Sequence, residues 1–299
     1  MDGQGEFIKL IIDSSTILLL ASLGELIKER SGILNLGLEG IISFSAMTAI
    51  AIYIESGNIY LAILLAGLSG SLLSLLHGYI SNYVKADQVL SGLAILFIGI
   101  GLSGLLGSRY EGLKVDPLTP YKIFIGDIVL SLDILTLLGY ILAPILYIII
   151  YRSRYGLIIR GLGDNPEGLD YLGYDVDRLR TLVTGLGGFL VGLAGAKLTL
   201  SLIPIWSIGV SGGRGWIALA LVVSSLWNPI LTFIVAHIFG FLNQFPILSQ
   251  AIGLDIDSRL ISTVPYLATI VLLTIFSLPI LRRLGYAPRE LGKPYIRKG

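Results

Sequence analysis

Eight separate runs of apolar residues, each about as long as a membrane crossing, constrain this chain more than any other feature of its sequence. The runs lie at 8–28, 35–54, 59–81, 88–107, 131–151, 181–202, 229–248 and 262–281. A helix of roughly 20 residues crosses the ~30 Å hydrocarbon core of a bilayer. Only 14% of the 299 residues are charged, against about 25% in an average globular protein. The sequence therefore predicts an all-α polytopic membrane protein with a single transmembrane domain over residues 1–299.

Lys and Arg are distributed unequally between the two sides that these runs define. If the N-terminus is outside, one side receives fourteen of them and the other receives seven. The first side holds Lys28, Arg30, Lys85, Arg152, Arg154, Arg160, Arg178, Arg180, Arg282, Arg283, Arg289, Lys293, Arg297 and Lys298, and the second holds Lys9, Arg109, Lys114, Lys122, Lys197, Arg214 and Arg259. Positively charged loops remain in the cytoplasm. We therefore expect an outside N-terminus, an inside C-terminus and localisation in the plasma membrane.

This orientation also requires a further, shorter membrane segment. After the run at 181–202 the chain is outside, so it needs three crossings to end inside, and only two full-length runs remain. Between them, Gly215–Leu226 makes an apolar helix of about 18 Å, which is only part of the bilayer thickness. Helix-breaking residues precede it, namely Pro204, Gly209, Gly212 and Gly213. We expect about nine membrane segments, one of which is a broken span between 203 and 228 that ends in a half-helix.

The first two apolar runs are separated by a cluster of charges and glycines, Glu29-Arg30-Ser31-Gly32-Ile33-Leu34-Asn35-Leu36-Gly37-Leu38-Glu39-Gly40. Such a cluster is not compatible with a lipid-facing position. It predicts irregular backbone that is buried in protein or lines a path through the bilayer. The acidic residues Asp13, Glu25 and Glu29 are costly in apolar surroundings. We expect them to be structural partners of Lys28 or Arg30.

The loop at 152–180 contains signals for one short helix near 166–172. Asn165 is a favourable N-cap, Pro166 suits the first helical position, and Glu167 suits the positive end of the helix dipole. Gly173 can end the helix. A helix of this length cannot cross a membrane, and it lies on the side predicted to be cytoplasmic. Two interpretations remain open: a docking element for a cytoplasmic partner, or a solvated loop with an incidental turn.

The sequence lacks the residues that characterise several functional classes. No GxxxxGK[ST] motif occurs, so the chain has no phosphate-binding loop and is not expected to hydrolyse ATP alone. The only histidines, His77 and His237, lie in different apolar runs without metal-binding spacing. Nucleophile, acid and metal-binding groups do not cluster as an enzyme would require. We expect no enzymatic activity, no metal site, no cofactor in this chain and no nucleic-acid partner.

Three blocks of sequence together resemble the permease subunits of ABC importers for nucleosides. The first is the cluster at 29–40, the second is Gly163-Asp164-Asn165-Pro166 with Gly173, and the third is Gly213-Arg214-Gly215-Trp216-Ile217-Ala218-Leu219-Ala220 with Trp227-Asn228-Pro229. The resemblance covers nearly all of 10–285. The chain departs from the family pattern at Gly168-Leu169, where a pair of alanines is usual, and at Tyr174, where an aliphatic residue is usual.

The resemblance implies a set of partners and a coupling site. In such importers an extracytoplasmic substrate-binding protein delivers the substrate, and this chain with a companion permease, identical or different, forms the path in the membrane lipid. ATP is then used by partner ATP-binding subunits. The loop at 152–180 becomes the cytoplasmic coupling loop. The residues implied in contact with the ATP-binding subunit are Asn165, Pro166, Glu167, Asp170 and Gly173.

A second set of residues is implied in the translocation path or its gate. These are Asn35, Glu39, Trp216, Asn243 and Gln244. The alternative for this set is hydrogen bonding between helices without contact to the substrate.

The apolar walls favour an uncharged substrate. Residues 56–84 and 215–254 contain no Lys, Arg, Asp or Glu, and desolvating a charged solute along such walls is expensive. The resemblance makes a nucleoside the first substrate class and a pentose or other sugar the alternative. An ion-coupled secondary transporter, with Asp13 or Asp87 as the coupling site, is a further alternative.

Overall fold

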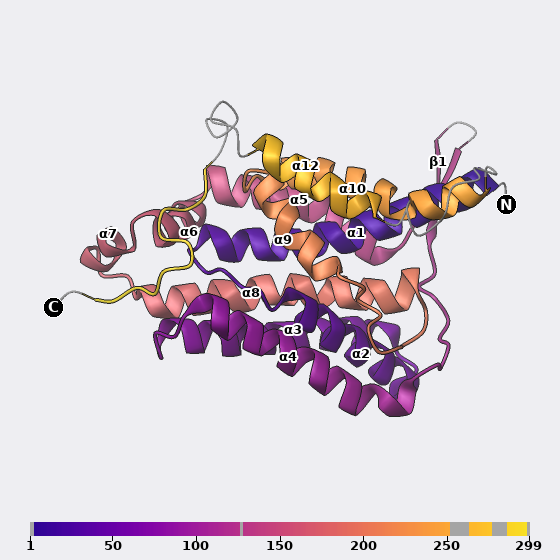
Figure 1. The fold of residues 1–299 in the computed structure, drawn as a ribbon, viewed down its shortest axis with the longest axis horizontal. Coiled ribbons are helices and arrows are strands. Elements are labelled where there is room, and N and C mark those ends of the chain that lie inside the picture. Colours follow the sequence, from indigo (N-terminus) through magenta and orange to yellow (C-terminus); the bar gives the residue numbers. More distant parts are fainter. Residues whose placement is uncertain (1–2, 126–127, 252–262, 277–285, 298–299) are drawn as a thin grey trace.

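The structure, a computed structural model, describes residues 3–125, 128–251, 263–276 and 286–297. The long helices run along one axis, with the N-terminus at one end of the molecule and the C-terminus at the other (Figure 1). The helices are α1 (Gly3–Arg30), α2 (Leu38–Ser56), α3 (Ile59–Asn82), α4 (Gln88–Gly107), α5 (Ile134–Arg152), α6 (Arg154–Asp164), α7 (Pro166–Tyr171), α8 (Val176–Lys197), α9 (Arg214–Ser224), α10 (Pro229–Ala251) and α12 (Val264–Phe276). A 3-10 turn, η1 (Ser108–Tyr110), follows α4, and a π-helical turn, η2 (Leu198–Leu202), follows α8.

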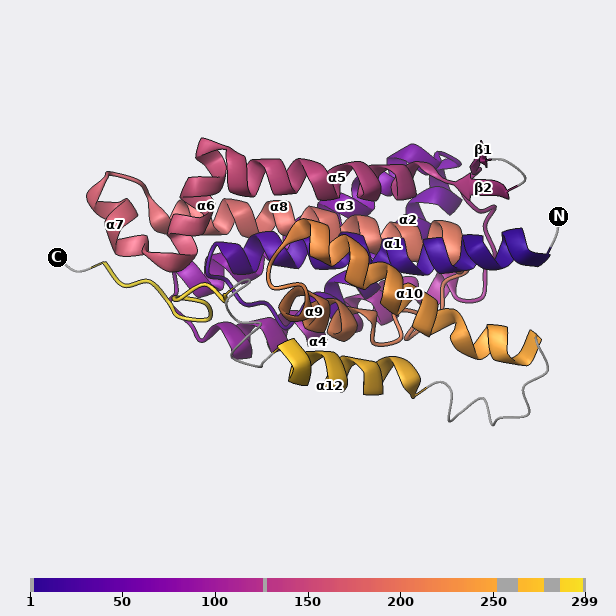
Figure 2. The ribbon, with the colours of Figure 1, turned by 90° about the horizontal axis from the view of Figure 1, so that it is seen from above.

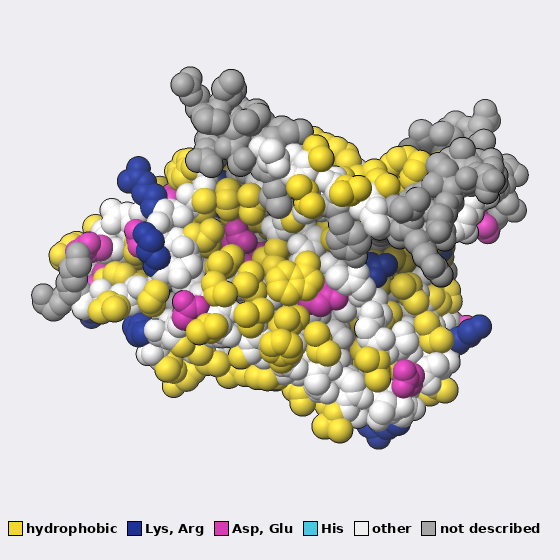
Figure 3. Space-filling view, in the orientation of Figure 1, with side chains coloured by type: hydrophobic (Ala, Val, Ile, Leu, Met, Phe, Trp, Pro, Cys, Tyr) yellow, Lys and Arg dark blue, Asp and Glu magenta, His cyan; other side chains and the backbone are white. Residues whose placement is uncertain are grey.

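Seven helices in the described part of the chain are long and apolar enough to cross a membrane: α1 to α5, α8 and α10. α1 and α8 run through the middle of the bundle in both views (Figures 1 and 2). In their apolar 18-residue stretches 83% and 72% of the residues are buried, against 33% in those of α3, α4, α5 and α10. Apolar side chains cover much of the middle of the visible face (Figure 3). The prediction of a polytopic membrane protein is therefore confirmed, with outer helices that present an apolar surface suited to lipid.

Glycines allow α3 and α8 to approach each other closely. A Cβ atom added to Gly70 of α3 would lie 2.5 Å from the carbonyl oxygen of Gly188 and 2.7 Å from the Cα of Gly192, both on α8. Small residues at such contacts are a common basis of helix association in lipid. Any side chain at Gly70 would force the two helices apart.

The chain is not entirely α-helical, which corrects the sequence prediction. Strand β1 (Tyr121–Ile125) pairs antiparallel with β2 (Ile128–Leu132) in a hairpin. The sequence between the strands is Gly126-Asp127, a dipeptide typical of two-residue hairpin loops. Because β2 occupies 128–132, the fifth span begins at Ile134 rather than 131. Asp133 caps this helix, since its carboxylate accepts a hydrogen bond from the backbone N–H of Thr136 at 2.9 Å.

The segment 152–180 contains more helix than the sequence predicted. α6 was not expected, and α8 begins at Val176 instead of 181. In both cases a side-chain cap defines the start: Ser153 accepts from the N–H of Gly156 at 3.1 Å, and Asp175 accepts from the N–H of Arg178 at 3.0 Å. The expected helix near 166–172 is confirmed as α7.

The break and the short apolar helix expected between 203 and 228 are present. Residues 203–213 form turns and two isolated β-bridges, and the apolar half-helix α9 follows over Arg214–Ser224. Gly209, Gly212 and Gly213 have φ values of +81°, +55° and +80°, a region that favours glycine. The last expected run, 262–281, corresponds to α12, and its residues beyond 276 lie outside the described part of the chain.

Candidate functional site

The N-terminal end of α9 is capped by a carboxylate from another helix. The first N–H groups of a helix have no partner within the helix, and the N-cap residue Gly213 has no side chain to supply one. Glu39, in the first turn of α2, accepts hydrogen bonds from the N–H groups of Gly213 and Gly215, each at 2.7 Å. A negative charge is also favourable at this end of the helix dipole. Glu39 thus fixes the start of α9.

The approach of α9 to α2 depends on a glycine. A Cβ atom added to Gly215 would lie 2.3 Å from the backbone nitrogen of Glu39. Only glycine therefore permits the two backbones to lie this close. This contact accounts for the glycine at position 215 of the third sequence block.

The C-terminal end of α9 is held by the last two residues of α1. Leu226 and Trp227 have φ values of 53° and 55°, a left-handed conformation that is unfavourable for non-glycine residues. Arg30 donates to the carbonyl oxygen of Trp227 from Nε at 3.2 Å and from Nη2 at 3.1 Å. Glu29 accepts from the indole N–H of Trp227 at 2.5 Å. These bonds stabilise the break between α9 and α10.

Glu29, Arg30 and Glu39 therefore fix both ends of the half-helix, and we call these three residues the α9 clamp. All three belong to the first sequence block, while the groups that they bind belong to the third. The clamp side chains are at most 7% exposed. Two blocks that are about 180 residues apart in the sequence thus form one structural unit.

Asn35 shapes the loop that joins α1 to α2. Its side-chain oxygen accepts from the N–H of Gly37 at 2.8 Å, and its own N–H donates to Glu25 at 3.1 Å. Glu25 also pairs with Lys28 at 2.5 Å, and Asn35, Glu25 and Lys28 are fully buried. The expected pairing of Glu25 with Lys28 is confirmed. Glu29 instead accepts from Trp227, as described above.

The other path candidates come from two helices. Trp216, on the first turn of α9, is 43% exposed next to the contact between Gly215 and Glu39. Asn243 and Gln244 lie on α10, where Gln244 is buried and Asn243 half-buried. The structure thus places Glu39 and Trp216 at the start of α9, and Asn35 in the loop before α2, where it contacts Gly37 and Glu25. Asn243 and Gln244 lie on α10.

The short helix α7 projects at the end of the molecule where the C-terminus lies (Figure 1). Asn165 caps it by accepting from the N–H of Gly168 at 3.0 Å, and Pro166 is its first residue. Gly173 ends it with φ of +85°. These local signals were all predicted from the sequence. Two residues near the C-terminus contact Asp170: the Tyr295 hydroxyl donates a hydrogen bond to it at 2.9 Å, and Arg297 forms an ion pair with it, with Nε 3.0 Å from Oδ2.

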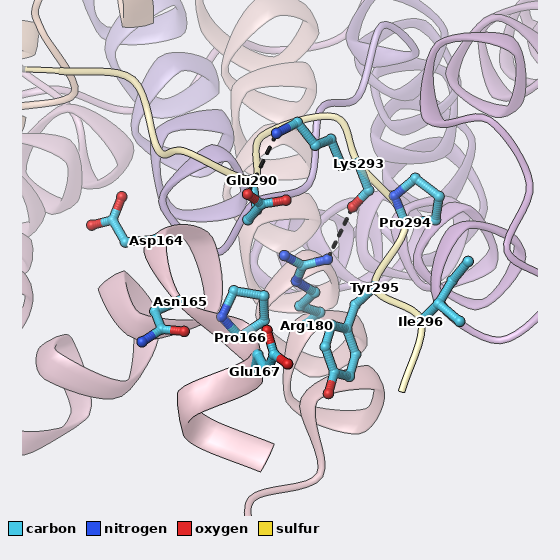
Figure 4. A pocket seen from close by; sticks show the side chains of 10 residues that line it. All are labelled: Asp164, Asn165, Pro166, Glu167, Arg180, Glu290, Lys293, Pro294, Tyr295 and Ile296. Atoms are coloured by element: carbon cyan, nitrogen blue, oxygen red, sulfur yellow. Dashed lines mark hydrogen bonds and ion pairs between the residues drawn. The ribbon is translucent and has the colours of Figure 1, made fainter. Parts of the chain in front are cut away.

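A cavity of about 370 Å³ lies between α7 and the C-terminal residues (Figure 4). Its lining residues are Asp164, Asn165, Pro166, Glu167, Arg180, Glu290, Lys293, Pro294, Tyr295 and Ile296. A second cavity, of about 350 Å³, lies on the other side of Tyr295 and includes Asp170 and Gly173. All five predicted coupling residues therefore line one of two neighbouring cavities.

Comparison with known proteins decides the family. Residues 7–278 match the family described as the branched-chain amino acid transport system / permease component. The chain belongs to this permease family. It is a multi-pass transport subunit of the cell membrane and not an enzyme, and permeases of this kind act with ATP-binding and substrate-binding partners.

Three relatives are similar to this permease over most of their length. The putative glucose ABC transporter permease protein TsgC13 of Haloferax volcanii is 32% identical, over 88% of this chain and 89% of that protein. The guanosine ABC transporter permease protein NupQ of Bacillus subtilis is 29% identical, over 94% and 93%. The nucleoside ABC transporter permease protein NupC of Lactococcus lactis is 29% identical, over 95% and 94%.

The permease exposes two apolar residues at the tip of α7 that sequence reasoning did not select. Tyr171 and Leu172 are 81% and 75% exposed. They follow directly after Asp170 and precede Gly173, at the end of a helix too short to enter the membrane. The sequence did contain a signal for them: two apolar residues at the end of a short capped surface helix have no core to be buried in, which suggests contact with a partner.

Another buried cluster of the permease corrects the predicted partner of Asp13. Lys197 of α8 bonds to Asp13 at 2.5 Å and to Asp133, and its ammonium also donates to Ser201 at 3.0 Å. Asp13, Asp133 and Lys197 are each at most 2% exposed. The expectation that Asp13 pairs with Lys28 or Arg30 is wrong, because Asp13 lies more than three helical turns before them on α1. The cluster joins α1, α8 and the start of α5.

Proposed function

We propose that this permease is the membrane subunit of an ATP-driven importer of nucleosides. The observation that carries the proposal is the union of the first and third sequence blocks around α9, since these blocks resemble nucleoside permeases in particular. The similarity to NupQ and NupC supports the same substrate class. The charge-free stretches 56–84 and 215–254 agree with an uncharged solute. A sugar is the second candidate, because TsgC13 is 32% identical.

The proposed arrangement places the N-terminus outside and the C-terminus inside, with α9 and α12 added to the seven long spans. The position of the two termini at opposite ends of the bundle supports an odd number of crossings (Figure 2), and the excess of Lys and Arg on the side of the C-terminus supports this orientation. Residues 1–299 then form one permease domain, and a companion permease completes the path. The residues proposed to line or gate it are Asn35 in the loop before α2, Glu39 and Trp216 at the start of α9, and Asn243 and Gln244 on α10. ATP is used by the partner subunit alone.

A competition experiment tests the substrate assignment. Uptake of labelled guanosine is measured in vesicles that contain the complete importer, with an excess of unlabelled nucleosides, free nucleobases, nucleotides, pentoses, glucose or amino acids. We expect nucleosides to suppress uptake and nucleotides not to, because a phosphate is costly to desolvate between uncharged walls. If glucose or a pentose enters the vesicles and nucleosides neither enter nor compete, the nucleoside assignment is wrong and the sugar assignment replaces it.

We also propose that the loop 152–180 is cytoplasmic and that α7 transmits movement of the ATP-binding subunit to the permease. The protruding position of α7 and its exposed apolar tip support this role, because an isolated apolar pair at the end of a surface helix suits a pocket in a partner. Asn165, Pro166, Glu167, Asp170 and Gly173 set the position of the tip.

Replacing Leu172 by Asp is expected to weaken binding of the ATP-binding subunit by about 30-fold or more. The reason is that a charge replaces an apolar contact at the centre of the proposed interface. The measurement is the dissociation constant of the purified ATP-binding subunit for the permease in nanodiscs. Leu113→Asp, at an exposed leucine just after η1 and outside the loop 152–180, is the matched control and should bind normally. Normal binding by Leu172→Asp would remove α7 from the interface.

A further inference from the structure

The C-terminal segment, residues 286–297, is an extended chain that crosses the α7 end of the molecule and bonds to several elements. The N–H of Glu290 donates to the carbonyl of Gly163 at 2.8 Å, next to the end of α6. The N–H of Gly292 donates to the carbonyl of Gly32 at 3.2 Å, in the loop after α1. Tyr295 and Arg297 then reach Asp170 on α7. The segment therefore links α7 to the block that carries the α9 clamp.

Arg180 fixes the middle of this segment. Its side chain is fully buried, and it donates to the carbonyl of Leu162 at 2.8 Å and to the carbonyl of Lys293 at 3.2 Å (Figure 4). A Cβ atom added to Gly32 would lie 2.6 Å from the Arg180 guanidinium. One buried side chain thus contacts α6, the C-terminal segment and the loop after α1.

The outer face of the segment is exposed beside α7. Ile296 is 68% exposed and lines the larger cavity with Asn165, Pro166 and Glu167. Tyr295 separates the two cavities, and burial together with its hydrogen bond to Asp170 raises the pKa of the Tyr295 hydroxyl to about 12. The hydroxyl therefore stays protonated and continues to donate to Asp170 throughout the physiological pH range.

Both cavities carry more carboxylates than cations. The larger is lined by Asp164, Glu167 and Glu290 against Arg180 and Lys293. The smaller is lined by Asp170, Asp175 and Asp177 against Arg297. A partner with basic side chains fits this charge distribution, since opposite charges across an interface favour encounter and register.

We propose that the C-terminal segment is the second half of the docking surface for the ATP-binding subunit. The subunit contacts Ile296 and Tyr295 together with the tip of α7, and it places basic side chains toward the two cavities. This inference rests on the proposed coupling role of α7 and extends it to a segment that no motif marked. It also gives the ATP-binding subunit a direct connection, through Gly292 and Arg180, to the loop before α2.

Two variants of the segment test the proposal in the nanodisc binding assay, and both leave the charge of the cavities unchanged. Ile296→Ser removes the apolar side chain from the exposed face, and Tyr295→Phe removes the hydrogen bond to Asp170. Each is expected to weaken binding of the purified ATP-binding subunit by about tenfold, with folding and yield unchanged. Raising the ionic strength is expected to weaken wild-type binding as well, because the cavities are acidic.

The outcomes separate this inference from the coupling role of α7. Weakened binding in Ile296→Ser and in Leu172→Asp, with Leu113→Asp unchanged, supports a composite surface. Normal binding in both C-terminal variants while Leu172→Asp loses binding would restrict the interface to α7 and overturn the inference. Normal binding in all of these variants would overturn the coupling role of α7 as well.

Discussion

Replacing Glu39 by Ala is expected to reduce substrate uptake by about 100-fold. The substitution removes two hydrogen bonds from a carboxylate to the start of α9, and each bond to a charged group contributes about 1.5 kcal/mol or more. A loss of about 3 kcal/mol corresponds to roughly a 100-fold smaller population of the correctly placed half-helix. Uptake in vesicles containing the complete importer measures the loss.

Two control variants and one labelling experiment test the role of Glu39. Glu39→Gln keeps one acceptor oxygen without the charge, so we expect an intermediate uptake. Glu111→Ala removes an exposed carboxylate and should transport normally. The chain contains no cysteine, so a single Trp216→Cys reporter can be labelled specifically. Its labelling rate should rise in the Glu39→Ala background, and unchanged labelling with unchanged uptake would show that Glu39 does not fix α9.

Replacing Arg30 by Ala is expected to destabilise the permease by about 3–5 kcal/mol, the usual cost of removing one partner from a buried charged network. The carbonyl of Trp227 loses its two guanidinium bonds, and the left-handed residues Leu226 and Trp227 lose the contacts that hold them. A lower apparent melting temperature in detergent and a lower yield of inserted protein are the expected results.

Two comparisons isolate the cause of this destabilisation. Arg30→Lys keeps the positive charge but cannot reproduce the planar guanidinium contacts, so its melting temperature should lie between those of wild type and Arg30→Ala. Arg154→Ala removes an exposed arginine of α6 and should melt like wild type. Equal melting temperatures for Arg30→Ala and Arg154→Ala would contradict the role of Arg30 in the α9 clamp.

Features determined by nearby residues could be predicted from the sequence. α7 is the best example, since its cap, first residue and end are set by Asn165, Pro166 and Gly173 within nine positions. The half-helix α9 could also be predicted, because its apolar residues and the glycines before it lie in one short stretch of sequence. The long spans followed from continuous apolar runs. The hairpin and α6 were missed although Gly126-Asp127 and Ser153 are recognised local signals.

Features determined by distant residues could not be predicted in the same way. Asp13 pairs with Lys197, and Glu39 caps a helix that begins at Arg214. Nothing in the sequence around a carboxylate shows which distant donor will reach it, so the five candidate residues of the path were named without their partners. The C-terminal segment gave no local signal at all, because its bonds to Gly163, Gly32 and Asp170 depend on the assembled bundle.

The α9 clamp has a mechanical consequence for transport. Because both ends of α9 are bonded to residues within Glu29–Gly40, the half-helix and the junction of α1 with α2 must move as one rigid body. A transporter that alternates between two openings needs a hinge, and that hinge therefore lies outside this body. The left-handed glycines Gly209, Gly212 and Gly213 occupy the turn just before α9. Gly213 is held by Glu39 and belongs to the rigid body, so Gly209 and Gly212 give the backbone the freedom to swing this body while every bond of the clamp stays intact.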